Sequence, residues 1–355
     1  MPPLVVEACR LPTPVLRRAA DAGQIVLRSW ADEHTHAPFA DRAWLLRSVR
    51  GASAFVGILP TPVDTALLDA AGPSLRVVST MSVGVDHIDV GAARARGVRV
   101  GHTPQVLDGA VADLTLALAL AVTRRMLEGE RVVRAGAWPG RPWNPLDFVG
   151  PALTGKTIGF FGFGGIAQTV VSRLLPFRPA RIVYTVSQPR ALDLGAPAFR
   201  TLAADPYIQL FYEKHRALPL PIENVSRDAL AREADIVIVL ASLNAHTRHV
   251  VDASFLAAMK PSAYLVNVAR GPLVDTAALV DALHAQQIAG AALDVVEGEP
   301  DISAAHPLLA PELADRVVVM PHIGSATREA REAMADVCAQ NALGGIGIGA
   351  MPAEI

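Results

Sequence analysis

Residues 157–168 read TIGFFGFGGIAQ, and this stretch decides the fold. Its apolar start, residues 157–161, predicts a strand, and helical spacing begins at Ala167. Between them stands Gly162-x-Gly164-x-x-Ala167, where the first glycine permits a tight turn and the second lets a pyrophosphate approach the backbone. The small Ala167 lets the following helix pack closely on the strand, and the start of that helix offers N–H groups to phosphates. The stretch therefore predicts a dinucleotide-binding loop.

Short aliphatic runs alternate with alanine-rich segments of helical spacing along the rest of the chain. The runs that predict strands are residues 24–27, 54–59, 76–79, 98–100, 157–161, 181–185, 236–240, 263–268, 290–294 and 317–320. The segments that predict helices are residues 62–71, 111–122, 167–175, 276–286 and 326–343. Such alternation is typical of parallel sheets covered by helices, so the sequence predicts an α/β fold. Two stretches break the alternation: we expect a structured loop over residues 136–151 and a surface insertion over residues 202–225.

Composition limits the possible classes of protein. A length of 355 residues predicts about two domains. The chain is 51% hydrophobic but only 5% aromatic, so its cores must consist mainly of aliphatic side chains. With 19% charged residues and a net charge of −2, the chain is neither disordered nor electrostatically suited to nucleic acid or an anionic membrane.

The cysteines and the apolar segments bear on location. The sequence holds two cysteines, Cys9 and Cys338, and no CxxC pattern. We therefore expect no disulfide framework, no zinc or other metal site, and a reducing, cytoplasmic compartment. The first ten residues do not resemble a secretory signal. The apolar residues 111–122 are too few to cross a bilayer, so they predict a buried helix and no membrane partner.

The strand after the nucleotide loop normally carries the residue that reads the adenosine ribose. A carboxylate at its end binds the 2′-hydroxyl and favours NAD. Here residues 182–190 read IVYTVSQPR, with Val186 about where the acid would stand. Ser187 and Arg190 can hydrogen-bond and neutralise a 2′-phosphate, so the sequence favours NADP over NAD. The alternative is that both are solvated loop residues and that cofactor choice is loose.

Three polar residues of complementary chemistry follow three predicted strands in the last third of the chain. They are Arg270 after residues 263–268, Glu299 after residues 290–294, and His322 after residues 317–320. Ligands of open α/β sheets bind at the carboxyl ends of strands, so these residues predict a site with a cation, an acid–base group and a carboxylate to tune it. Taken singly, each has another interpretation: Arg270 as a capping or ion-pair residue, Glu299 as a loop acid, and His322 as a structural histidine.

Together these motifs make the sequence similar to the D-isomer-specific 2-hydroxyacid dehydrogenases. Three segments carry the resemblance: residues 78–88 (VSTMSVGVDHI), the GFGGIA loop, and the Arg–Glu–His series in the family's order and spacing. The likeness extends from about residue 50 to the C-terminus and is greatest to the glyoxylate/hydroxypyruvate reductase branch.

The resemblance implies roles for the residues of the site. His322 is expected as the general acid that protonates the keto oxygen, Glu299 as the group that holds and charges the imidazole, and Arg270 as the cation that binds the substrate carboxylate. The backbone N–H groups of Val83 and Gly84 are expected to hold the same carboxylate. The implied reaction is the NAD(P)H-dependent reduction of glyoxylate or hydroxypyruvate to the D-2-hydroxy acid.

The resemblance also implies a set of cofactor-binding residues, with Asp294 beside the nicotinamide carboxamide. These are Gly162, Gly164, Gly165, Ile166, Ser187, Arg190, Leu243, Val268, Asp294, His322 and Gly324. The sequence departs from the family at Gly165, where an arginine is usual, and at Asp113, where a glutamate is usual. Asp147 stands where some relatives carry a tryptophan that reaches the partner subunit's active site, so substrate preference is expected to depend on this position.

The implied architecture has two Rossmann-like domains, with the cofactor domain inserted into a flavodoxin-like substrate domain. We expect residues 1–106 and 326–355 to bind substrate and residues 107–325 to bind NAD(P). The long apolar helix from Ala110 and the loop after it are expected to form a homodimer interface. Alternative functions are a D-lactate, phosphoglycerate or phosphonate type of dehydrogenase, or a non-enzymatic dinucleotide sensor of the corepressor kind.

Overall fold

The computed structural model describes residues 1–34, 37, 39–59 and 61–355, and it divides into two compact units. The first unit contains Met1–Leu107 and Ser325–Ile355, and the second contains Asp108–Gly324. The second unit is thus inserted into the sequence of the first, with limits one residue away from those expected at each junction.

The first unit is built on a five-stranded sheet in the order β2-β1-β3-β4-β5, in which all strand pairs are parallel. Its strands are β1 (Leu4–Glu7), β2 (Val26–Ser29), β3 (Ala54–Gly57), β4 (Val77–Thr80) and β5 (Arg99–Gly101). This order is that of flavodoxin-like doubly wound sheets. A single antiparallel bridge joins the C-terminal segment to the sheet, between Gly101 and Glu354.

Helices cover this sheet. The helix α14 (Arg328–Gly345) contacts β3, β4 and β5 and is itself contacted by α1 (Val15–Asp21). An apolar cluster of this unit contains side chains of α3 (Arg42–Ser48), α4 (Thr65–Ala71) and α5 (Val90–Ala95), which pack with those of β1, β3 and β4. Short helices α2 (Trp30–Glu33) and η1 (Gly72–Ser74) complete the unit. Aspartates cap several helix starts; Asp64, for example, accepts from the backbone N–H of Leu67 at 3.0 Å.

The second unit contains a seven-stranded parallel sheet in the order β12-β11-β10-β9-β6-β7-β8. Its strands are β6 (Thr157–Phe161), β7 (Arg181–Thr185), β8 (Ile222–Asn224), β9 (Ile236–Val239), β10 (Tyr264–Asn267), β11 (Gly290–Leu293) and β12 (Val317–Val319). The strand order reverses between β6 and β9, and doubly wound sheets bind ligands at such a point.

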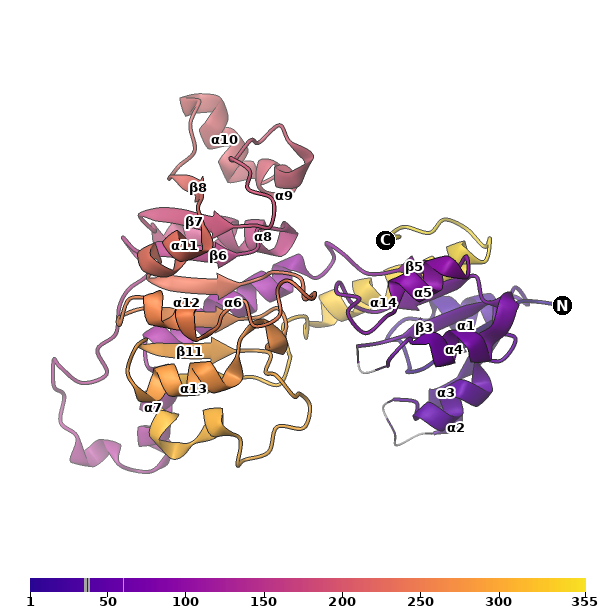
Figure 1. Cartoon of the computed structure of the whole chain (residues 1–355), viewed down its shortest axis with the longest axis horizontal. Helices are drawn as coiled ribbons and strands as arrows, with labels where there is room; N and C mark the ends of the chain where they lie inside the picture. The colour runs from indigo at the N-terminus through magenta and orange to yellow at the C-terminus, as the bar shows by residue number, and fades with distance from the viewer. Residues whose placement is uncertain (35–36, 38, 60) are drawn as a thin grey trace. The chain divides into compact units, whose positions relative to one another are not determined.

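Both faces of this sheet are covered, which explains why its strands are continuous apolar runs. On one face, α11 (Arg227–Glu233), α12 (Ala253–Ala258) and α13 (Thr276–His284) bury side chains in one apolar cluster with the strands (Figure 1). The helix α6 (Asp108–Thr123) contacts β10, β11 and β12 and packs with α8 (Gly165–Leu174). The remaining elements are α7 (Met126–Arg134), α9 (Arg200–Ala203), α10 (Pro206–His215), η2 (Trp138–Gly140), η3 (Leu175–Phe177), η4 (Pro197–Phe199), η5 (Gly271–Leu273), η6 (Pro307–Leu309) and η7 (Pro311–Leu313).

The observed elements confirm the predicted α/β class and add two strands. The strand β1 lies near the N-terminus, and β8 lies inside residues 202–225, where a surface insertion was expected. That expectation is wrong for the end of the segment, because Ile222–Asn224 pairs with β7 as an edge strand. An edge strand is short and polar on its open side, so Ile222-Glu-Asn lacks the apolar run that marks the central strands. No helix within the described residues is long and apolar enough to cross a membrane.

Candidate active site

The turn between β6 and α8 has the geometry that its glycines predict. Gly162 has φ +89°, and a Cβ there would lie 2.7 Å from the backbone nitrogen of Ala241, which follows β9. Glycine is therefore required both for the left-handed backbone and for the close approach of two strand ends. A Cβ on Gly164 meets no described atom within 4 Å, and Ala167 is fully buried. The loop leaves open space at the helix start, where the sequence predicts a pyrophosphate.

Gly165 is explained by a neighbour that sequence reasoning did not identify. A Cβ at this position would lie 2.6 Å from Oδ2 of Asp108, the first residue of α6. The arginine usual in the family would therefore displace the Asp108 carboxylate. The two residues are 57 positions apart by number, and no local pattern connects them, so only the packing of α6 against α8 reveals the pair.

The segment after β7 is held to the nucleotide loop. The Tyr184 hydroxyl donates to the Arg190 carbonyl at 2.7 Å, and the Tyr184 ring stacks on Phe163 at a centroid distance of 4.1 Å. The buried side chain of Gln168 donates to the carbonyls of Phe163 and Ala198. These contacts fix the course of the chain where the ribose residues were predicted.

Ser187 and Arg190 are both exposed at this end of the sheet. Arg190 lines a hollow of about 610 Å³ together with residues of the β8 region, including Glu223 and Asn224. Glu223 is a carboxylate that sequence reasoning did not consider, and Arg181 pairs with it at 2.7 Å. The hollow thus combines one acid already paired with an arginine and a second arginine, Arg190.

The three residues predicted to be catalytic follow neighbouring strands. Arg270 comes after β10, Glu299 after β11 and His322 after β12, and these strands pair in parallel in that order. Because the carboxyl ends of parallel strands meet at one edge of a sheet, all three loops start from the same edge.

Glu299 and His322 form a direct pair. His322 Nδ1 lies 2.7 Å from Glu299 Oε1, and because a carboxylate only accepts, Nδ1–H is the donor. The other oxygen, Oε2, accepts from the backbone N–H of Val296 at 3.2 Å. The two side chains are 33% and 32% exposed, so the imidazole is held by one nitrogen while part of the ring stays accessible.

Asp294 organises the loop that carries His322. Its carboxylate accepts from the backbone N–H groups of Ile323 at 2.8 Å and Gly324 at 2.7 Å. The backbone carbonyl of Asp294 accepts from the backbone N–H of His322 at 2.8 Å. These bonds hold His322 at φ +55°, a left-handed conformation that is uncommon outside glycine. Burial raises the pKa of the Asp294 carboxyl above its ordinary value, although both N–H donors act in the opposite direction. Asp294 therefore shapes the His322 loop, a function that the sequence does not reveal.

Arg270 stands on a loop that packs against the Glu299 loop. Its Nη1 donates to the Ala269 carbonyl at 2.8 Å, and its own carbonyl accepts from the fully buried amide of Asn267 at 2.9 Å. A Cβ on the next residue, Gly271, would overlap the peptide between Val296 and Glu297. Only glycine permits this approach, so the two loops touch through their backbones.

The remaining predicted residues lie in both units. The second unit holds the partly buried Ile166 and Leu243 and the buried Val268 and Gly324. Val83 and Gly84 follow β4 in the first unit, where the Gly84 carbonyl accepts from Ser82 Oγ at 2.7 Å. The Val83 carbonyl lies 3.0 Å from His102 Nδ1. The second contact holds the Val83–Gly84 peptide, which carries the Gly84 N–H of the predicted carboxylate site.

A dinucleotide-type loop at the reversal point of a doubly wound sheet, with an imidazole–carboxylate pair at the same edge, defines an α/β dehydrogenase. Residues 116–206 and 194–324 match the family described as D-isomer specific 2-hydroxyacid dehydrogenase, NAD binding domain. The chain belongs to this family.

Two relatives and a solved structure agree with this membership. A glyoxylate reductase of Thermofilum pendens is 42% identical over 300 residues, covering 84% of this chain and 80% of that protein. The human glyoxylate reductase/hydroxypyruvate reductase is 36% identical over 345 residues, covering 96% of both. The structure of an NADPH-dependent glyoxylate/hydroxypyruvate reductase from Sinorhizobium meliloti, in complex with NADP and malonate, has a TM-score of 0.79 at 29% identity and covers 100% of this chain and 97% of that chain.

The comparisons confirm the resemblance, the fold class and the oxidoreductase class. The names of the relatives agree with the expected reduction of a small 2-keto acid, and they do not favour the alternative dehydrogenases or the corepressor-like sensor. Among the described residues, no group of three or more His, Cys, Asp or Glu side chains is arranged to hold a metal ion.

Proposed function

We propose that the protein is a reductase of glyoxylate and hydroxypyruvate that forms the D-2-hydroxy acid with a reduced nicotinamide cofactor. The observation that carries this proposal is the 2.7 Å contact between His322 and Glu299 at the edge of the sheet that also carries Arg270. An imidazole paired with a carboxylate is suited to give a proton to a carbonyl oxygen as hydride arrives.

The catalytic roles follow from the hydrogen bonds. Because Nδ1–H of His322 is engaged by Glu299, Nε2 is the nitrogen that gives its proton to the keto oxygen in reduction and takes one in oxidation. The carboxylate of Glu299 accepts from Nδ1–H and so fixes the orientation of the imidazole. Arg270 binds the substrate carboxylate and draws electron density from the carbonyl. The N–H groups of Val83 and Gly84 bind the same carboxylate, as a backbone nest binds an anion.

We assign cofactor binding to residues 107–325 and substrate binding to residues 1–106 and 326–355. When bound, the nicotinamide supplies the hydride. The open space at Gly164 and the turn at Gly162 suit the pyrophosphate, with Gly165 and Ile166 at the start of α8. The nicotinamide end is assigned to Leu243, Val268, Asp294, His322 and Gly324.

We propose NADP as the preferred cofactor and NAD as the lesser one. The support is the lack of an acid directly after β7, the exposed Ser187 and Arg190, and the NADP in the related Sinorhizobium structure. Purified protein should show a higher kcat/KM with NADPH than with NADH, and Arg190→Ala should narrow the difference. A strong preference of the wild type for NADH would overturn this assignment.

We also propose a homodimer formed by α6 and the loop after it. The support is a set of exposed apolar side chains in this loop, among them Trp143 at 87% and Leu146 at 80% exposure. Sedimentation velocity should find dimers of the wild type and monomers of Leu146→Asp. The control is Leu210→Asp on α10, which changes another exposed leucine, at 66% exposure, and should leave the dimer intact. A monomeric wild type would refute the interface.

The two free, buried cysteines, Cys9 and Cys338, support a reducing, cytoplasmic location. The reaction itself is tested by following cofactor absorbance with a panel of 2-keto acids. We expect glyoxylate and hydroxypyruvate to give the highest kcat/KM, and chiral analysis to find D-glycerate from hydroxypyruvate. An L-product, or no turnover of either acid, would refute the proposed function.

A further inference from the structure

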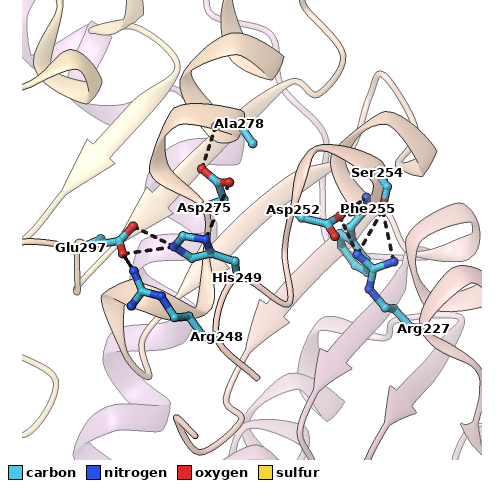
Figure 2. A network of polar contacts seen from close by, with 9 residues as sticks. All are labelled: Arg227, Arg248, His249, Asp252, Ser254, Phe255, Asp275, Ala278 and Glu297. Atoms are coloured by element: carbon cyan, nitrogen blue, oxygen red, sulfur yellow. Dashed lines mark hydrogen bonds and ion pairs between the residues drawn. The ribbon is translucent and has the colours of Figure 1, made fainter. Parts of the chain in front are cut away.

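A second histidine–glutamate pair, His249 and Glu297, lies near the predicted catalytic pair, and its glutamate stands two residues before Glu299. His249 Nε2 is 3.1 Å from both carboxylate oxygens of Glu297, and Arg248 donates to the same carboxylate (Figure 2). On the other side of the ring, Nδ1 lies 3.8 Å from Oδ2 of Asp275. Arg248, Asp275 and Glu297 are the charged groups that contact or flank this imidazole.

This pair touches both loops of the candidate active site. Glu297 and Glu299 are separated only by Gly298, which has φ +92°. A carboxylate held at position 297 therefore limits where the carboxylate at position 299 can lie. The neighbouring Val296 N–H donates to Glu299 Oε2, so the same short turn directly holds the partner of His322.

The segment that carries His249 is in turn fixed to the Arg270 loop. The backbone N–H of His249 donates to the Pro272 carbonyl at 2.8 Å, and that of Val251 donates to the Leu273 carbonyl at 3.0 Å. Gly271 of that loop packs directly on the Val296–Glu297 peptide. His249 thus joins, through its backbone and its ring, the loop of Arg270 and the loop of Glu299.

The backbone of His249 indicates that this connection is imposed by its surroundings. Its φ is +51°, and His322 has the same left-handed conformation at φ +55°. Such conformations are unfavourable outside glycine and persist where surrounding contacts determine them, which is common at functional sites.

We propose that His249 and Glu297 are positioning residues that lock the Glu299 loop against the Arg270 loop and so set the geometry of proton transfer. This inference rests on the proposed roles of Arg270, Glu299 and His322.

The test uses variants that remove the interaction without new strain. His249→Asn removes the imidazole but keeps a residue that tolerates the left-handed backbone. Glu297→Gln keeps the size of the side chain and removes its charge. Arg227→Gln is the matched control, because Arg227 pairs with Asp252 and contacts the Val250 carbonyl of the same segment but does not reach the Glu299 loop (Figure 2).

Three readouts are needed: kcat and KM for glyoxylate, the Kd of the cofactor, and hydrogen exchange of peptides spanning residues 294–303. We expect His249→Asn and Glu297→Gln each to lower kcat by about 10- to 100-fold, as a small misplacement of reacting groups does, with little change in cofactor Kd. Exchange over residues 294–303 should become faster. The double variant should be no worse than the worse single variant, because the two residues act as one unit. Arg227→Gln should keep the wild-type kcat, the wild-type cofactor Kd and the wild-type exchange over residues 294–303.

Unchanged exchange and kcat in both variants, additive losses in the double variant, or an equal loss in Arg227→Gln would each overturn the inference. His322→Gln, measured in parallel, separates this from failure of the proposed function. If His322→Gln loses activity while Glu297→Gln keeps it, the positioning role alone is wrong. If His322→Gln keeps wild-type activity, the proposed catalytic roles are wrong, and the inference fails with them.

Discussion

Replacing Asp294 with asparagine tests how the His322 loop is held. Asp294 is 1% exposed, and each of its carboxylate oxygens accepts one backbone N–H, from Ile323 and from Gly324. An asparagine has one acceptor oxygen, so its amide nitrogen must face the second N–H. Both groups are donors, and one buried N–H is left without a partner.

The expected cost can be estimated from this geometry. Losing the charge alone should change the free energy of unfolding little, because burial already disfavours the ionised carboxyl and raises the pKa of Asp294. The buried, unsatisfied N–H then dominates, at about 1–3 kcal/mol. For a unit of this size, each kcal/mol lowers the melting temperature by roughly 2–4 °C. Because the freed N–H belongs to the loop of His322, kcat should also fall, by up to about 100-fold for a 1 Å displacement.

Two assays together check this estimate. Thermal unfolding should show a lower melting temperature for Asp294→Asn, and steady-state kinetics should show a lower kcat for glyoxylate. Asp301→Asn makes the same chemical change at an exposed position and should leave both unchanged. If Asp294→Asn unfolds and turns over like the wild type, the two hydrogen bonds do not hold the loop, and the reasoning is wrong.

Three further outcomes follow from the contacts of other residues. His322→Gln should lower kcat by about 100-fold or more because it removes the proton donor, and a wild-type kcat in this variant would exclude His322 as the general acid. Arg270→Ala should lower kcat/KM for glyoxylate with cofactor Kd unchanged, and wild-type kcat/KM would contradict its role. Burial raises the pKa of the Glu7 carboxyl, so the wild type should lose stability as pH rises from the ordinary carboxyl value through that raised pKa. Urea unfolding of Glu7→Gln across this window should show a smaller loss, and parallel pH profiles would contradict the assignment.

Local patterns in the sequence determined the class of fold and the residues of the candidate site. Strands such as β6 and β7 were predicted with their observed bounds, because a buried parallel strand is a continuous apolar run between turn residues. The turn at Gly162 and Gly164 was predicted because backbone conformation and close approach restrict residue type at single positions. Arg270, Glu299 and His322 were predicted as site residues because each stands in the loop after a recognisable strand.

The tertiary structure alone decided how these parts support one another. Glycine at position 165 leaves the space of a Cβ to the Asp108 carboxylate of another helix, which a larger residue would displace. Asp294 holds the His322 loop, because its carboxylate accepts from two backbone N–H groups about thirty residues later in the chain. The pairing of His249 with Glu297 depends on which strand ends are adjacent. Strand order and loop packing bring together residues that are distant in the chain, and no local periodicity or propensity encodes which distant residue will be the neighbour.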